Sequence, residues 1–184
     1  MLLNIKSIMN FCSNCGSPHL SNVTPPGDNR PRTVCGRCGT IHYHNPKIIA
    51  GCLPLWEDKV LLCRRAIEPR QGFWNIPAGF MEVGETVEEA AMREVWEEAA
   101  AKVNLIGVHT IFTFTRFYHV YIQFLGELVG GHFGVGEESL ESRLFTEVEI
   151  PWEHIAFESS VFALHRFFED RRSGKGWQVH VGHV

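Results

Sequence analysis

The stretch GFMEVGETVEEAAMREVWEEAAA covers residues 79–101 and governs how the rest of the chain is interpreted. Its second half is rich in alanine and glutamate, a composition typical of a helix. Three carboxylates crowd near the C-terminal end of that helix: Glu94, Glu97 and Glu98. The helix dipole leaves negative partial charge at this end, so the position disfavours anions. The cluster therefore needs an explanation other than helix stability.

The predicted helix begins at a capping box, because Thr86 is followed three positions later by Glu89. At about 100° for each residue, one arc of about 120° combines the three glutamates with small apolar residues. The members of this arc are Val87, Ala90, Ala91, Glu94, Glu97, Glu98 and Ala101. A solvated acidic surface paired with Arg93 is the simpler interpretation, but it predicts acids opposite the apolar residues. The arrangement on the wheel disfavours it.

Close carboxylates on a half-buried face repel one another and resist desolvation. A bound divalent cation removes both problems, and oxygen ligands at i, i+3 and i+4 suit Mg²⁺ or Mn²⁺. Mg²⁺ commonly joins protein carboxylates to substrate phosphates. The helix therefore predicts a divalent-metal site that acts on phosphates.

Length and composition set the broad class of protein. The 184 residues suffice for one domain with a small appendage, and 45% hydrophobic with 21% charged residues is an ordinary globular balance. No apolar run approaches the roughly 20 residues of a membrane helix, and the start, MLLNIKSIMN, does not read as a secretory signal. We therefore expect a cytoplasmic protein without a membrane partner.

The net charge of −4 is unevenly spread, with +4 over residues 1–47 and −8 over the remainder. A basic N-terminal segment ahead of an acidic remainder favours docking of one on the other within the chain, or contact of the basic segment with an anionic ligand. The charge is too small to favour nucleic acid as a partner.

Four of the six cysteines form two pairs, CSNC at Cys12 and Cys15 and CGRC at Cys35 and Cys38. The 19 residues between the pairs match the spacing of four-cysteine zinc sites. Four thiolates leave no open coordination position, which favours a structural zinc ribbon. Disulfides or a redox pair are the alternatives, and the lack of a secretion signal disfavours disulfides.

Apolar runs after the ribbon predict the remaining elements. KIIAGCLPLWEDKVLLCRR predicts a hairpin around Glu57 and Asp58, with Cys52 and Cys63 as buried thiols. The aromatic and β-branched run at residues 103–130 predicts two antiparallel strands. GGHFGVGEE predicts a loop, SRLFTEVEI a strand, SSVFALHRFFEDRRSG an amphipathic helix, and GWQVHVGHV a terminal strand or tail.

Strands interleaved with two helices predict a mixed α/β sandwich, an α+β arrangement, at residues 46–184. A ribbon at residues 11–45 precedes this domain, and residues 1–10 form an N-terminal extension. We identify no internal repeat.

The order of the residues in the 79–101 stretch resembles the Nudix box, a motif written G-x₅-E-x₇-R-E-U-x-E-E-x-G-U, where U is an apolar residue. Gly79 opens it, Glu85 follows, and Arg93 begins REVWEE. The usual second glycine is Ala100 here, and because alanine is the stronger helix former, the helix is expected to extend slightly.

The four-cysteine ribbon with NPKIIAGC, KVLLCRR, GFWNIPAGF and ESLESRLF is similar to a Nudix subgroup with an N-terminal ribbon. Plant FAD and ADP-ribose pyrophosphatases belong to that subgroup. The resemblance implies a Nudix α/β/α sandwich with a mixed β-sheet.

The resemblance also implies the catalytic roles. Mg²⁺ or Mn²⁺ is expected on Glu94, Glu97, Glu98 and the Gly79 carbonyl. Glu98 or a loop acid would act as base. The loop candidates are Glu138 and Glu141, with Glu137 as a further one. Arg93 is expected to pair with Glu85. For each loop acid, the alternative is an ordinary solvated charge.

Substrate contacts follow from the same resemblance. Arg64 and Arg65 are candidates for phosphate binding, although a role at an exposed strand end is equally compatible. Trp74 or Phe73 is a candidate for stacking on a flat base, although aromatics here are more often core. Four other side chains are interpreted as surface histidines: His42, His44, His180 and His183.

The expected activity is metal-dependent hydrolysis of a nucleoside diphosphate linked to another moiety, with ADP-ribose or FAD as the small-molecule substrate. An NAD(H) or capped-RNA pyrophosphatase is the alternative, but AKVNLIGVHTIFTF stands where the S-Q-P-W-P-F-P-x-S signature of NADH pyrophosphatases is expected. A nucleotide-sensing or nucleic-acid-binding regulator is the other alternative, disfavoured by the intact acid set. A homodimer is compatible with the resemblance, since Nudix ADP-ribose hydrolases are often dimers.

Overall fold

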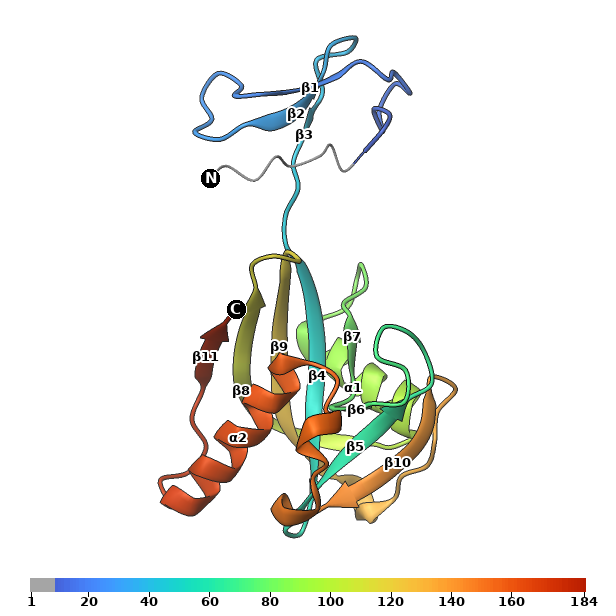
Figure 1. Cartoon of the computed structure of the whole chain (residues 1–184), viewed down its shortest axis with the longest axis vertical. Coiled ribbons are helices and arrows are strands. Elements are labelled where there is room, and N and C mark those ends of the chain that lie inside the picture. The colour runs from blue at the N-terminus through green and yellow to red at the C-terminus, as the bar shows by residue number, and fades with distance from the viewer. Residues whose placement is uncertain (1–8) are drawn as a thin grey trace. The chain divides into compact units, whose positions relative to one another are not determined.

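The computed structural model describes residues 9–184 in two compact units, one that ends at Asn45 and one that runs from Pro46 to Val184 (Figure 1). Most of the N-terminal extension expected at residues 1–10 thus lies outside the described residues. Within the described part of the chain, no helix is both long and apolar enough to cross a membrane.

The first unit is a small antiparallel sheet of three strands, β1 (Leu20–Val23), β2 (Arg32–Cys35) and β3 (Ile41–His42), in that order. Two tight turns lie next to it, each closed by a backbone hydrogen bond to a cysteine carbonyl. Gly16 donates to Cys12 and Gly39 donates to Cys35. Both glycines have positive φ, 69° and 73°, a conformation that glycine adopts without steric cost.

The second unit is built on one mixed sheet with the strand order β10-β5-β4-β9-β8-β11. The strands are β4 (Lys47–Trp56), β5 (Lys59–Arg65), β8 (Val103–Phe114), β9 (His119–Leu128), β10 (Ser139–Phe145) and β11 (His180–His183). Strand β4 runs parallel to β9 and β11 runs parallel to β8, whereas the other neighbours are antiparallel. Two short strands, β6 (Trp74–Asn75) and β7 (Ala78–Phe80), pair with β5 and β4.

Helices α1 (Val87–Ala99) and α2 (Glu158–Ser173) cover opposite faces of the sheet (Figure 1). Alternate residues of the strands supply the two cores. Cys52 and Cys63 pack with the alanines of α1, whereas Leu53 and Leu62 pack with Leu164 of α2. Three short 3₁₀ helices complete the unit: Val129–Gly131, Glu147–Glu149 and Trp152–His154. The predicted α/β/α sandwich with a mixed sheet, both hairpins and both buried thiols are confirmed.

The two ends of α1 differ in how well the sequence predicts them. The capping box is present, because the Glu89 amide donates to Thr86 Oγ1 at 3.2 Å and the Thr86 amide donates to Glu89 Oε2 at 2.7 Å. At the other end, the expected extension is wrong. The helix ends at Ala99, and Ala100 has left-handed backbone angles, φ 46° and ψ 36°. Ala100 thus adopts the conformation that a glycine would favour there, at a steric cost of about 1–2 kcal/mol.

Candidate active site

The acids of α1 divide into two buried carboxylates and one exposed carboxylate. Glu94 is 8% exposed and Glu98 is 6% exposed, whereas half of the Glu97 side chain is accessible. Residues 94 and 98 lie one turn apart on the face that packs on the sheet. The helical wheel is therefore correct for Glu94 and Glu98, while Glu97 lies at the edge of the buried face.

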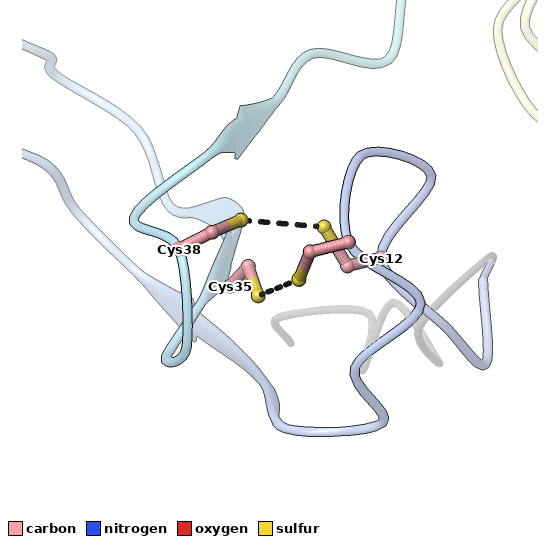
Figure 2. A group of neighbouring side chains, drawn as sticks. Cys12, Cys35 and Cys38 are labelled. Carbon is pink, nitrogen blue, oxygen red and sulfur yellow. Dashed lines mark hydrogen bonds between the residues drawn. The ribbon is translucent and has the colours of Figure 1, made fainter.

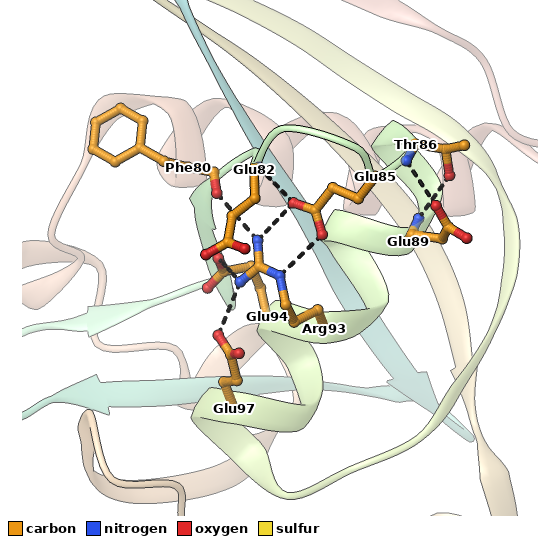
Figure 3. Close-up of polar contacts among 8 residues, drawn as sticks. All are labelled: Phe80, Glu82, Glu85, Thr86, Glu89, Arg93, Glu94 and Glu97. Atoms are coloured by element: carbon orange, nitrogen blue, oxygen red, sulfur yellow. Dashed lines mark hydrogen bonds and ion pairs between the residues drawn. The ribbon is translucent and has the colours of Figure 1, made fainter.

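Arg93 joins the acids of α1 to the segment that precedes the helix (Figure 3). Its guanidinium donates to both oxygens of Glu85 at 3.0 and 2.8 Å, to the Phe80 carbonyl at 3.1 Å, to Glu94 at 2.7 Å and to Glu97 at 2.9 Å. The bidentate bond from Arg93, helped by the Glu82 amide, lowers the pKa of Glu85 to about 2. The pair that the sequence predicts between Arg93 and Glu85 is present and fastens the 81–86 segment to the helix.

Strand β7 presents its backbone to the buried carboxylates. A Cβ atom built on Gly79 would lie 2.2 Å from Glu94 Oε1, so only glycine allows this approach. The neighbouring Ala78 amide donates to Glu98 Oε1 at 3.4 Å. These contacts bring β7 and the two buried acids of α1 together at one place.

The negative charges of the buried Glu94 and Glu98 carboxylates have few hydrogen-bond donors or cations to offset them. The pKa of Glu98 is raised to about 8, chiefly by burial and in part by the nearby charges of Glu94 and Glu138, against the opposing effects of the Ala78 amide and Arg65. Burial also raises the pKa of Glu94, despite its bond to Arg93. Such a site favours a proton or a metal cation on its oxygens.

The three helix carboxylates do not converge on one point. Among residues 9–184, the groups that bring three or more candidate ligand atoms within 4.8 Å of one another are a four-cysteine cluster and a His-Asp-His cluster. Instead, one Arg93 nitrogen bridges Glu94 and Glu97, and only the amide of Ala78 donates to the Glu98 carboxylate in the described chain. The Arg93 guanidinium therefore lies between Glu94 and Glu97, two of the three side chains that were expected to bind the metal.

The glycine-rich loop that follows β9 docks on the end of α1. Gly134 donates to the Ala99 carbonyl at 2.6 Å, and Gly136 donates to the Glu98 carbonyl at 3.0 Å. A Cβ atom at Gly136 would lie 1.6 Å from the Glu97 carbonyl oxygen, so this contact also requires glycine. Helices leave their last carbonyls unpaired, and the loop supplies the missing donors.

The two predicted loop acids, Glu138 and Glu141, lie in different surroundings. The charge of Glu138 acts on both Glu94 and Glu98, which places Glu138 beside the site. Glu141 lies on β10 opposite Arg64 of β5, and the two side chains form an exposed ion pair at 3.9 Å.

The predicted substrate contacts also differ in position. Arg65 acts electrostatically on Glu98, and its guanidinium lies over the Phe157 ring, 5.1 Å from the centroid. Arg64 donates to the Gly72 carbonyl at 3.0 Å. Trp74 packs edge to face on Phe145, with the rings 4.8 Å apart, beside the α2 core. Of these candidates, the structure brings Arg65 near the acids.

Sequence reasoning missed several neighbours of the site. The Ala78 amide and Gly136 act through their backbones, and only the unusual density of glycine in the 130–136 loop signals a close approach. Phe80 is 49% exposed, with the Lys47 ammonium 5.1 Å from its ring centroid and the His119 ring at 5.3 Å. Its place just after Gly79 in the motif was the available signal.

The cysteines of the first unit form a four-sulfur cluster (Figure 2). Cys12 Sγ lies 3.7 Å from Cys38 Sγ, and Cys15 Sγ lies 3.6 Å from Cys35 Sγ. A tetrahedron with Zn–S bonds of about 2.3 Å has edges of about 3.8 Å, so the spacing fits zinc. The Thr40 hydroxyl, 3.1 Å from Cys38 Sγ, together with the Thr40 backbone amide, lowers the pKa of that thiol to about 5 and favours the thiolate. The cluster fits a closed, structural zinc site.

Comparisons with known proteins agree with this architecture. The NUDIX domain family model matches residues 45–164, and the Nudix N-terminal zinc-ribbon model matches residues 10–44. The crystal structure of a NUDIX hydrolase from Nitrosomonas europaea is 46% identical, covers 96% of this chain and 99% of its own, and superposes with a TM-score of 0.89.

Two curated relatives carry more specific names. An ADP-ribose pyrophosphatase of Methanocaldococcus jannaschii is 34% identical over 59% of this chain and 67% of its own length. A NAD-capped RNA hydrolase of Salmonella paratyphi C is 30% identical over 77% of this chain, and the match spans about half of that relative, 53%. The chain belongs to the Nudix hydrolase family, with a zinc-ribbon segment ahead of the Nudix domain.

Proposed function

We propose that this chain hydrolyses the pyrophosphate of a nucleoside diphosphate linked to another moiety, with ADP-ribose as the principal substrate. The observation that carries the proposal is the meeting of two buried carboxylates with the backbone of β7, Glu94 against Gly79 and Glu98 against the Ala78 amide. Buried carboxylates with so little compensating charge suit an enzyme that handles phosphate through a divalent cation.

The donor atoms suit Mg²⁺ or Mn²⁺, because both cations prefer oxygen ligands. Glu94, Glu98 and the Gly79 carbonyl would hold the cation, and half-exposed Glu97 would join them by giving up its bond to Arg93. A bound cation supplies neutralisation of the pyrophosphate charge and a water of lowered pKa.

The remaining roles belong to side chains that orient or accept protons. Arg93 positions the 81–86 segment and Glu94 through its bonds to Glu85 and Glu94. Glu98 or Glu138 would accept the proton of the attacking water, and Glu138 is the loop acid whose charge reaches the buried pair. Arg65 would contact a substrate phosphate. Glu141, paired with Arg64, ranks behind Glu138 as a base.

The choice of ADP-ribose is supported by the name of the Methanocaldococcus relative. A NAD-capped RNA or NAD(H) substrate is the second candidate, supported by the name of the Salmonella relative. The missing NADH signature after the Nudix box favours the first candidate over the second. FAD, the other substrate that the sequence resemblance implies, is not named by either relative and belongs in the same test.

The test is product analysis by mass spectrometry with ADP-ribose, NADH, FAD and a NAD-capped RNA, each with Mg²⁺. We expect AMP and ribose 5-phosphate from ADP-ribose, and a loss of at least about 100-fold in kcat for Glu98→Gln. Glu88→Gln is the matched control, since Glu88 is an exposed acid in the first turn of the same helix. Full activity of Glu98→Gln contradicts the site. A higher kcat/KM for a different substrate contradicts only the choice of ADP-ribose.

A further inference from the structure

A second cluster of metal-ligating side chains lies on the face of the sheet away from α1. His109 of β8, Asp170 of α2 and His180 of β11 each place one candidate ligand atom within 4.8 Å of the other two. They come from three elements, and neither the proposed hydrolysis nor the zinc ribbon uses them. His180, expected to be an ordinary surface histidine, is only partly exposed and is bonded within this cluster.

The ring of His109 is held in a defined tautomer. Its Nε2 atom lies 3.0 Å from the Ala163 carbonyl, which can only accept, so Nε2 carries the proton. Nδ1 then carries a lone pair. His109 is 1% exposed, and its Nδ1 has no hydrogen-bond partner anywhere in residues 9–184. A buried acceptor without a partner is costly, and it is the arrangement found when a histidine ligates a metal through one nitrogen and bonds a carbonyl through the other.

Asp170 supplies the charged member of the cluster. It is 7% exposed, and its Oδ2 atom accepts from the Gln178 amide at 3.2 Å and contacts His180 Nε2 at 2.9 Å. Its Oδ1 atom takes part in neither contact. The rings of His109 and His180 meet edge to face with centroids 5.5 Å apart. One further imidazole, that of His180, and the Asp170 carboxylate therefore lie within ligand distance of the buried His109 ring.

We propose that His109, Asp170 and His180 bind a divalent transition-metal ion, with Zn²⁺ as the best fit, and that this ion fastens β11 to β8 and α2. Two nitrogen ligands and one carboxylate oxygen form a set that zinc accepts readily, whereas magnesium prefers oxygen alone. The parallel pairing of β11 with β8 aligns His180 with Thr110, next to His109. The proposal is independent of the catalytic assignment, because the carboxylates of α1 lie on the opposite face of the sheet.

Zinc stoichiometry of the full chain tests this proposal. Protein dialysed against excess Mg²⁺, which competes at the catalytic acids, should hold about two zinc ions per chain, one in the ribbon and one here. His180→Asn and His109→Ala should each hold about one. His183→Asn should keep both ions, because His183 is an exposed histidine of the same strand. Added zinc should also raise the melting temperature of the wild type and of His183→Asn, but not of His180→Asn.

Cobalt separates the two sites by their ligands. In a Cys35→Ser variant, Co²⁺ should still bind about one equivalent with the weak visible absorption of nitrogen and oxygen ligands, and without a thiolate charge-transfer band. Should the buried His109→Ala variant fail to fold, His180→Asn decides the matter, since His180 is partly exposed on a terminal strand. A wild type that holds only the ribbon zinc, or a His180→Asn variant with unchanged zinc content, overturns the proposal.

Discussion

Glu98→Gln should change the pH dependence of stability in the metal-free protein. The pKa of Glu98 rises from 4.5 to about 8 in the folded chain, chiefly because of burial. The folded state therefore holds this proton more tightly than the unfolded state does. Its stabilising effect is fully present below pH 4.5 and is lost as the pH rises through about 8.

The size of the effect follows from the same values. At about 1.4 kcal/mol for each pH unit between 4.5 and about 8, an ionised Glu98 destabilises the metal-free fold by up to about 5 kcal/mol. Between pH 5.5 and pH 8 the wild type should lose about 3 kcal/mol through this group. Glutamine keeps the acceptor for the Ala78 amide and cannot ionise, so the variant should be nearly neutral at low pH and more stable than the wild type at pH 8.

Urea unfolding followed by tryptophan fluorescence measures this difference. All five tryptophans lie at or after Trp56, so the signal reports on the second unit and not on the ribbon. The free energy of unfolding of the wild type and of Glu98→Gln is measured at several pH values without Mg²⁺ or Mn²⁺. Glu88→Gln is the control for removal of an exposed acid. Adding Mg²⁺ should stabilise the wild type at pH 8 much more than Glu98→Gln. Parallel pH profiles for wild type and Glu98→Gln would refute the reasoning.

Four further changes follow from close contacts in the structure. Gly79→Ala should lower kcat at least about 10-fold, because the new Cβ meets the Glu94 carboxylate, whereas Gly107→Ala, whose Cβ meets nothing within 4 Å, should leave kcat unchanged. Gly136→Ala should destabilise the second unit by about 1–3 kcal/mol in urea unfolding, because the new Cβ overlaps the Glu97 carbonyl. Val135→Ala, at an exposed position of the same loop, is the control, and an equal effect of the two substitutions contradicts the docking of the loop on α1. Ala100→Gly should stabilise the same unit by about 0.5–1 kcal/mol, because glycine relieves the left-handed strain, and a loss of stability would mean that Ala100 is unstrained. Cys35→Ser should remove the ribbon zinc in a metal assay while Cys63→Ser retains it, and full zinc in Cys35→Ser rules out the ribbon site.

Local patterns in the sequence were enough for the elements and for much of the site. The capping box at Thr86, the hairpin at Glu57 and Asp58, and the spacing of the cysteine pairs each depend on residues close in the chain. Such signals are decided by backbone chemistry and periodicity, which a single sequence carries. The wheel placed Glu94 and Glu98 correctly for the same reason.

Features that depend on distant packing were not predictable. Helix propensity favours a continued helix at Ala100, but the 130–136 loop supplies donors to the last carbonyls, and tertiary contacts override the propensity. Glu97 accepts a hydrogen bond from Arg93, a residue outside the arc of the helical wheel that holds the three glutamates. His109 and His180 meet only because β11 pairs in parallel with β8, and no local signal records that pairing.

The two glycine contacts with α1 also define where this protein tolerates engineering. Because Gly134 and Gly136 are tied to the helix that carries the buried acids, the 134–136 segment has a fixed shape and length. Residues 130–133 precede this anchor, and Glu137 with Glu138 follows it. Loop grafting or random insertion should therefore be tolerated better in these flanks than within the 134–136 segment. A library that spares the 134–136 segment keeps the hydrogen-bond donors to the last carbonyls of α1 in place while it varies the rest of the loop.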